Sequence, residues 1–161
     1  MTNRFPTRVD IPAEVCDELA TFLNQAYATT VDLASQVRQA RLTVRGPGST
    51  ELQRLFAEMT DNLYAQADAL ARRTAHIGGA PQLTVRAAAA ASTLPDWDHD
   101  QHAAAVVVEA VGDRFELHAS ALRRLVEMSA QHDEPGTRHV LTVTATEVEA
   151  DLWRLDSYLA D

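Results

Sequence analysis

Apolar side chains recur at intervals of three and four residues through four stretches of the chain. This spacing puts them on one face of an α-helix, which repeats every 3.6 residues. The first stretch begins at Pro12, a favourable first helical residue, and continues to about Leu42. Its apolar positions are Val15, Leu19, Phe22, Leu23, Ala26, Ala34 and Val37. The pattern predicts a long amphipathic helix over residues 12–42.

A second helix is predicted after the break at residues 45–49, a segment that contains glycine and proline. Thr50 and Gln53 have the spacing of a capping box, which places the start of the helix at Thr50. Gly78 and Gly79 mark its end. Its apolar positions are Leu52, Leu55, Phe56, Met59, Leu63, Ala67 and Leu70.

The next stretch, residues 81–98, combines a run of alanines that favours a short helix with Pro95, which ends one. We expect a long crossover there. A third helix is predicted from about His99 to Gln131, and a fourth with Thr137 as its cap. Their apolar positions are Val106, Val107, Ala110, Val111, His118, Leu122 and Leu125 in the third helix, and Val140, Leu141, Val148, Leu152, Leu155 and Leu159 in the fourth.

The lengths of the connections predict how the helices are arranged. Short links join the first helix to the second and the third to the fourth, whereas the link between the second and third is long. An antiparallel four-helix bundle with one long crossover is the ferritin-like arrangement. We therefore expect an all-α fold with a short helix on the crossover, forming a single domain over residues 1–161 with residues 1–10 as a flexible tail.

Composition supports one compact domain, because 46% of the 161 residues are hydrophobic. No apolar stretch approaches the roughly 20 residues that cross a bilayer, so we expect no membrane span. The N-terminus lacks the apolar segment of a signal peptide, and the lone Cys16 rules out an internal disulfide framework. These features predict a cytoplasmic protein.

The formal charge of -9 bears on partners, since it repels polyanions at long range. Arg4 and Arg8 in the N-terminal segment are the only local basic element. We expect DNA binding to be weak or absent. An acidic surface of this kind serves solubility, or an acidic shell that attracts cations.

Several segments of the sequence resemble the Dps mini-ferritins, which belong to the ferritin-like superfamily. Residues 38–46 read Arg-Gln-Ala-Arg-Leu-Thr-Val-Arg-Gly, where Dps proteins usually have Lys-Gln-Ala-His-Trp-Asn-Val-Arg-Gly. The order and spacing of the matching segments agree over nearly the whole chain. The other matching segments are residues 24–25, 52–56, 75–79, 92–95, 112–115 and 151–155.

The resemblance implies a hollow dodecamer, built from dimers, that oxidises Fe(II), stores the mineral and protects DNA during stress. It also implies a dinuclear iron site across a two-fold interface, with two His and one Asp from one subunit and an Asp and a Glu from its neighbour. In this sequence the five positions fall, in that order, at Arg41, Gln53, Ala57, Asp68 and Arg72. Asp68 is therefore the only one of the five positions that keeps the ligand residue of Dps proteins.

The chemistry of the substituted residues argues against an efficient oxidation site. Iron prefers carboxylate and imidazole ligands, whereas the guanidinium groups of Arg41 and Arg72 offer only donors and a fixed positive charge. With Asp68 they suggest an arginine–carboxylate bridge between subunits. We favour a cage that sequesters metal, with iron as the only candidate cofactor. Two alternatives remain: slow oxidation through Asp68, Asp61 or Glu58, and a dimeric helical protein that forms no cage and binds a protein partner.

Three carboxylates of the third predicted helix share one face, because Glu109, Asp113 and Glu116 have the spacing i, i+4 and i+7. Such a face is usually solvated. Acidic residues of this region line the three-fold pores of Dps cages, and Asp113 matches an aspartate of that kind. The trio is thus either a solvated face or an acidic pore that attracts cations.

A second polar cluster precedes the third predicted helix and consists of Asp96, Asp98, His99, Asp100 and His102. If helical, His99 and His102 share a face and can bind a metal. We favour an N-terminal helix cap instead, since Asp98 and Asp100 suit the positive end of the helix dipole. His118 lies on the apolar stripe and is interpreted as a core histidine.

Overall fold

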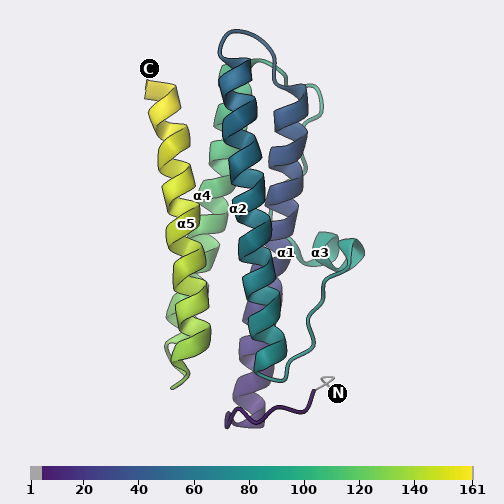
Figure 1. Cartoon of the computed structure of the whole chain (residues 1–161), viewed down its shortest axis with the longest axis vertical. Helices are drawn as coiled ribbons and strands as arrows, with labels where there is room; N and C mark the ends of the chain where they lie inside the picture. Colours follow the sequence, from purple (N-terminus) through teal and green to yellow (C-terminus); the bar gives the residue numbers. More distant parts are fainter. Residues whose placement is uncertain (1–4, 161) are drawn as a thin grey trace.

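The computed structural model describes residues 5–160 and contains four long helices and one short one. The long helices lie side by side as an antiparallel bundle, and the short helix lies beside it on the crossover (Figure 1). The predicted all-α, ferritin-like bundle with a helix on its long crossover is confirmed. No helix of the described range is long and apolar enough to span a membrane. The helices are α1 (Ala13–Thr43), α2 (Ser49–His76), α3 (Val85–Ala91), α4 (Ala104–Ser129) and α5 (Pro135–Ala160).

The predicted apolar stripes form the core between the four long helices. Each helix buries at least one large side chain completely, for example Leu23 of α1, Phe56 of α2, Phe115 of α4 and Leu141 of α5. Burial of such a side chain stabilises the fold by roughly 1.5–3 kcal/mol. Two predicted core positions are wrong: Val106 and Leu159 are 44% and 48% exposed. Because α4 begins at Ala104, Val107 and Val108 occupy the inner side of its first turns.

Two helix starts differ from the predictions. No side chain caps α2, which begins at Ser49 after Gly48 in a left-handed conformation, so the capping box at Thr50 is wrong. The fourth long helix begins at Pro135, whose fixed φ suits a first helical position. The carboxylate of Glu134 accepts hydrogen bonds from the backbone N–H groups of Gly136 and Thr137, at 2.9 and 2.7 Å. Glu134 therefore takes the capping role that we predicted for Thr137.

The third long helix begins later than predicted, at Ala104 instead of His99. The preceding residues pair with the link between α1 and α2. The backbone N–H of Arg45 donates to the carbonyl of His102 at 2.7 Å, and the N–H of Ala104 donates to the carbonyl of Arg45 at 3.1 Å. This pairing keeps His102 and Ala103 outside the helix, and the residues just before them form a turn.

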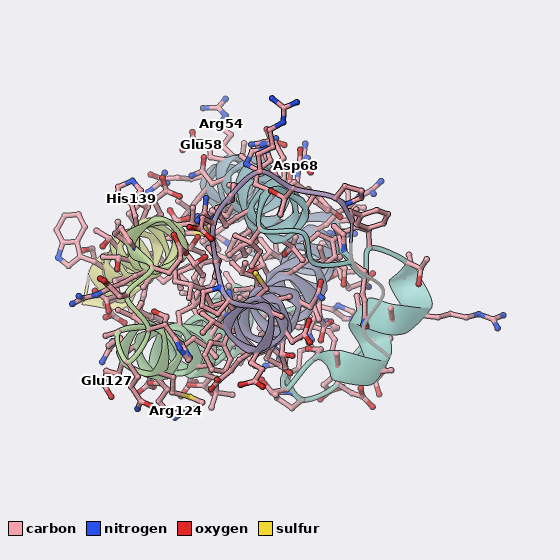
Figure 2. The ribbon with its side chains drawn as sticks, turned by 90° about the horizontal axis from the view of Figure 1, so that it is seen from below. Arg54, Glu58, Asp68, Arg124, Glu127 and His139 are labelled. Atoms are coloured by element: carbon pink, nitrogen blue, oxygen red, sulfur yellow. The ribbon has the colours of Figure 1, made fainter. Side chains whose placement is uncertain are left out.

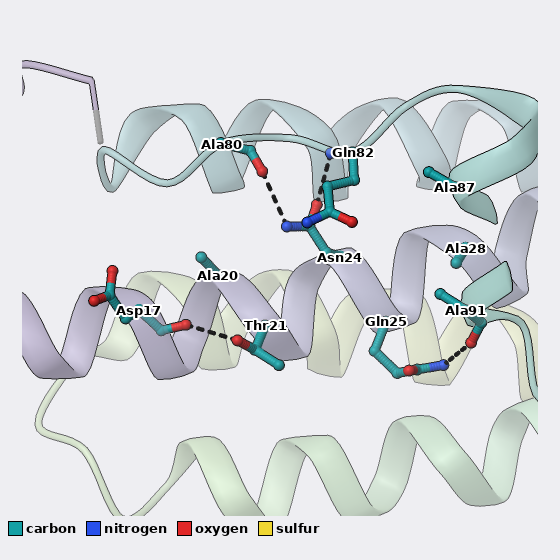
Figure 3. Close-up of a pocket in the computed structure, with 10 residues that line it drawn as sticks. All are labelled: Asp17, Ala20, Thr21, Asn24, Gln25, Ala28, Ala80, Gln82, Ala87 and Ala91. Carbon is teal, nitrogen blue, oxygen red and sulfur yellow. Dashed lines mark hydrogen bonds between the residues drawn. The ribbon is translucent and has the colours of Figure 1, made fainter. Parts of the chain in front are cut away.

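Side chains of α1 fasten the crossover to the bundle (Figure 3). The Asn24 amide donates to the carbonyl of Ala80 at 3.0 Å and accepts from the N–H of Gln82 at 3.0 Å. The Gln25 amide donates to the carbonyl of Ala91 at 2.7 Å. These bonds satisfy backbone groups that the irregular segment leaves unpaired.

The N-terminal segment was predicted to be a flexible tail, and its residues 1–4 lie outside the described residues. Phe5 donates its N–H to the carbonyl of Gly78 at 2.9 Å, and the Thr7 hydroxyl donates to the carbonyl of His76 at 2.9 Å. Residues 5–7 therefore lie against the end of α2.

Candidate functional site

Three of the five positions aligned with the dinuclear site lie together where α1 and α2 meet. Arg41 is in the last turn of α1, and Gln53 and Ala57 lie one turn apart near the start of α2. The short link between α1 and α2 sets the two helices side by side. Arg41, Gln53 and Ala57 all line one pocket of about 340 Å³. The other lining residues are Leu42, Thr50 and Arg54.

The remaining two positions, Asp68 and Arg72, are exposed one helical turn apart on α2. Asp68 lies fifteen positions after Gln53, which corresponds to about 22 Å along the helix. Figure 2 shows Asp68 on the same side of the molecule as Arg54 and Glu58, away from α4. A single copy of the chain therefore does not bring the five positions together.

The residues in this pocket do not fit a dinuclear iron centre. Arg41 contributes a fixed positive charge, Gln53 a neutral amide and Ala57 a methyl group, so the pocket has no anionic ligand. Over residues 5–160, no three His, Cys, Asp or Glu side chains form a group that can hold a metal ion. Iron oxidation at this place would thus lack the ligands that bind Fe(II).

The surroundings of Asp68 are aromatic. Burial raises the pKa of the Tyr27 phenol, and the negative charge of Asp68 raises it further. The Tyr27 hydroxyl faces the carbonyl of Leu83 at 3.4 Å. One carboxylate beside a phenol is a weak site for a divalent cation, because such ions need several anionic or imidazole ligands.

Of the two other alternative ligands on α2, Glu58 is engaged in an ion pair and Asp61 is exposed. The Glu58 carboxylate lies 2.6 Å from the guanidinium of Arg154 on α5, so a cation would have to displace an ion pair. Asp151 accepts from the same arginine at 3.2 Å. Arg154 therefore neutralises the acidic side chains where α2 and α5 meet.

Known proteins share this architecture and this sequence pattern. The family model for the ferritin-like domain matches residues 20–161. The chain belongs to this family. The DNA protection during starvation protein of Agrobacterium fabrum is 22% identical to it over 155 residues, which cover 96% of each chain. The resemblance to the Dps mini-ferritins is thereby confirmed.

Solved Dps structures have the fold of this ferritin-like chain. DpsA14 from Streptomyces coelicolor superposes with a TM-score of 0.91 at 22% identity and covers 98% of this chain and 94% of its own. A Dps protein from Vibrio cholerae, a member of a broad superfamily of ferritin-like diiron-carboxylate proteins, gives 0.87 at 20% identity and covers 98% and 99%. The bundle and its crossover are thus those of Dps proteins.

The acidic trio of this ferritin-like protein lies on α4. Glu109, Asp113 and Glu116 are all exposed. Burial lowers the pKa of the neighbouring Arg114, and the charge of Asp113 counteracts that effect. The trio presents negative charge to solvent, as both predicted interpretations require.

The cluster at residues 96–102 forms a turn before α4. The Asp98 carboxylate accepts from the N–H of Asp100 at 3.0 Å and from the Gln101 amide at 3.1 Å. The helix starts after Ala103 without a side-chain cap, so the predicted capping role is wrong. The physical reason is the pairing of His102 with Arg45, which delays the helix by about one turn.

Two polar residues of α4 are buried: Arg114, for which no role was predicted, and His118, which was interpreted as a core histidine and is 1% exposed. The Arg114 guanidinium lies 5.0 Å from the centre of the Trp97 ring and donates to the side chain of Gln36 and to the carbonyl of Asp96. Nε2 of His118 lies 2.9 Å from the Thr30 hydroxyl, and burial lowers the pKa of His118 to about 4. The sequence signal for both is their place on the apolar face of the helix.

Proposed function

We propose that this protein is a Dps-type mini-ferritin that assembles into a dodecamer built from dimers and sequesters metal, without efficient Fe(II) oxidation at the aligned positions. The observation that carries the proposal is the pocket in which Arg41 stands beside Gln53 and Ala57. A fixed guanidinium at that place repels Fe(II), and its neighbours supply no anionic ligand.

Support for assembly comes from the separation of the positions on one chain. Arg41 at one end of the α1–α2 hairpin and Asp68 with Arg72 farther along α2 are exposed, so two copies can place them opposite one another. An Arg41–Asp68 pair between copies then stabilises the interface in place of a shared metal. The acidic face at Glu109 and Asp113 is proposed as the route by which cations enter.

Protection of DNA is proposed only as a weak or indirect activity. The curated relative carries DNA protection in its name, whereas the charge of -9 on this chain opposes contact with DNA. Arg8 is exposed, and Arg4 lies outside the described residues. A cytoplasmic location accords with this function.

The test is an anaerobic Fe(II) titration of the purified oligomer followed by oxygen, recording bound iron per subunit and the oxidation rate together. We expect an oxidation rate close to that of buffer. The quadruple variant Arg41→His, Gln53→His, Ala57→Asp and Arg72→Glu restores the ligand set, and we expect it to oxidise Fe(II) at least tenfold faster. Adding Asp68→Asn to this variant serves as its control and should abolish the gain.

A fast, saturable rate in the unmodified protein that disappears in Asp68→Ala would contradict the proposal and favour an enzyme with displaced ligands. The mass in solution tests assembly separately. A dodecamer is expected, whereas a stable dimer would favour the helical interaction protein that forms no cage.

A further inference from the structure

The pocket between α1 and α2 carries two positive charges. Arg41 and Arg54 both line it, and neither takes part in an ion pair within the described part of the chain. Two acidic residues lie one turn from Arg54 on α2: Glu58 is bound to Arg154 at 2.6 Å, and Glu51 is exposed and forms no ion pair with either arginine in the described part of the chain. The two guanidinium groups are therefore available to a ligand of opposite charge.

The other polar groups of the pocket are neutral donors. Thr50 offers a hydroxyl and Gln53 an amide, and Thr50 lies in the first turn of the 28-residue helix α2, at its positive end. Leu42 and Ala57 add apolar wall and no charge. Several donors, two fixed positive charges and no carboxylate make up a lining that selects an anion.

We infer that this pocket binds a phosphate-class oxyanion, held by Arg41 and Arg54 and oriented by Thr50 and Gln53. Guanidinium groups present paired N–H donors that match two oxygens of a phosphate, which makes arginine the preferred residue for such ligands. The volume of about 340 Å³ accommodates inorganic phosphate or the terminal phosphate of a small monoester.

Assembly does not reverse the charge of the pocket. If a second copy brings its Asp68 to Arg41, the same helix turn brings Arg72 as well, because the two residues are one turn apart. Three arginines then face one aspartate. The inference goes beyond the proposed function. All residues of the pocket come from a single chain, but Arg41 is also the arginine proposed to meet Asp68 of a second copy, so phosphate binding and oligomer mass are measured separately.

The source of the phosphate is a small free molecule and not a DNA backbone. The chain has a net charge of -9, so a polyanion meets long-range repulsion that a small anion avoids.

Calorimetric titration of the iron-free full chain with inorganic phosphate tests the inference, at constant ionic strength with chloride as the competing anion. We expect saturable binding with one phosphate per chain, and at least tenfold weaker binding in the double variant Arg41→Gln, Arg54→Gln. Arg86→Gln, which removes an exposed arginine on α3, is the matched control and should bind like the unmodified protein.

The double variant Arg41→Lys, Arg54→Lys keeps the charge but not the paired donors, and should bind with intermediate affinity at unchanged oligomer mass. A competition experiment uses a short DNA duplex, which should not displace the bound phosphate. No saturable phosphate binding by the unmodified protein, or equal binding by the glutamine variant, would overturn the inference. Duplex DNA that displaces phosphate would overturn the assignment to a free molecule.

Discussion

The guanidinium of Arg73 lies 2.6 Å from the carboxylate of Glu134 and so joins the end of α2 to the start of α5. The same carboxylate caps α5 through the N–H groups of Gly136 and Thr137. Burial by itself raises the pKa of Glu134, but the hydrogen bonds from Thr137, Arg73 and Gly136 outweigh it and lower the pKa overall. The charged form is thus the one that the fold stabilises.

Glu134→Ala should lower the free energy of unfolding by about 2 kcal/mol, because it removes a helix cap and the ion-pair partner of Arg73. Denaturant unfolding at pH 7 measures the effect. Glu127→Ala, at an exposed position on α4, is the control and should change stability little. Since the pKa of Glu134 is lowered, the difference between Glu134→Ala and the unmodified protein should shrink as the pH falls through its ordinary titration range. A difference that persists in acid would argue against this cap.

Acid should destabilise the protein through His118. Burial lowers its pKa from 6.5 to about 4. The fold favours the neutral imidazole. The contribution of His118 to the free energy of unfolding is therefore fully present above pH 6.5 and is lost as the pH falls from there to about 4. The loss is on the order of 3 kcal/mol. His118→Leu should flatten the dependence of stability on pH in this window, whereas the control His139→Gln, at an exposed position on α5 (Figure 2), should leave it unchanged.

At neutral pH, the buried Asp151 should lower the stability of the fold, whereas the neutral His118 does not. Burial raises its pKa, although Arg154 counteracts the shift. The fold therefore favours the protonated acid, and the charged form opposes folding once the pH exceeds the raised pKa. Asp151→Asn should raise the melting temperature at pH 7 by a few degrees and should lose this advantage in acid. A lower melting temperature at pH 7 would mean that the bond to Arg154 matters more than burial.

Arg114→Lys should loosen the crossover. Lysine cannot reproduce the donors that reach Gln36, Ala110 and Asp96 together, so we expect a loss of about 2 kcal/mol in unfolding free energy. Amide exchange should accelerate in residues 92–103 before it does in the bundle. The control is Arg123→Lys, whose ion pair with Glu149 is exposed and worth less than about 1 kcal/mol.

The sequence predicted the helices well wherever periodicity governs them. Leu52 and Phe56 lie on a regular stripe and are fully buried, as expected. The start of α4 was missed because His102 and Ala104 pair with Arg45, more than fifty residues away in the chain, and so delay the first turn of the helix. No local pattern reveals such a contact. The cap of α5 was missed for a different reason: Glu134 is not a usual capping residue, although Pro135 after it was a signal for the first helical position.

Part of the lining of the pocket coincides with the positions that the resemblance to Dps proteins singled out. The resemblance to Dps proteins put Arg41, Gln53 and Ala57 at positions of one site, and in the structure these three residues line the same pocket. Arg54 was not predicted to join them, because it is adjacent to Gln53 and outside the aligned pattern. Its contribution depends on the side of α2 that faces α1, which only the packed hairpin defines.

Adjacent residues of α2 contact different surroundings. Gln53 and Ala57 line the pocket, whereas Leu52 and Phe56, each one position earlier, are completely buried in the core. Substitution on the first pair alters the chemistry of the surface without opening a void between the helices. The bundle can therefore exchange an affinity for cations for an affinity for anions while its melting behaviour stays nearly constant, which makes it a suitable host for transplanted binding sites.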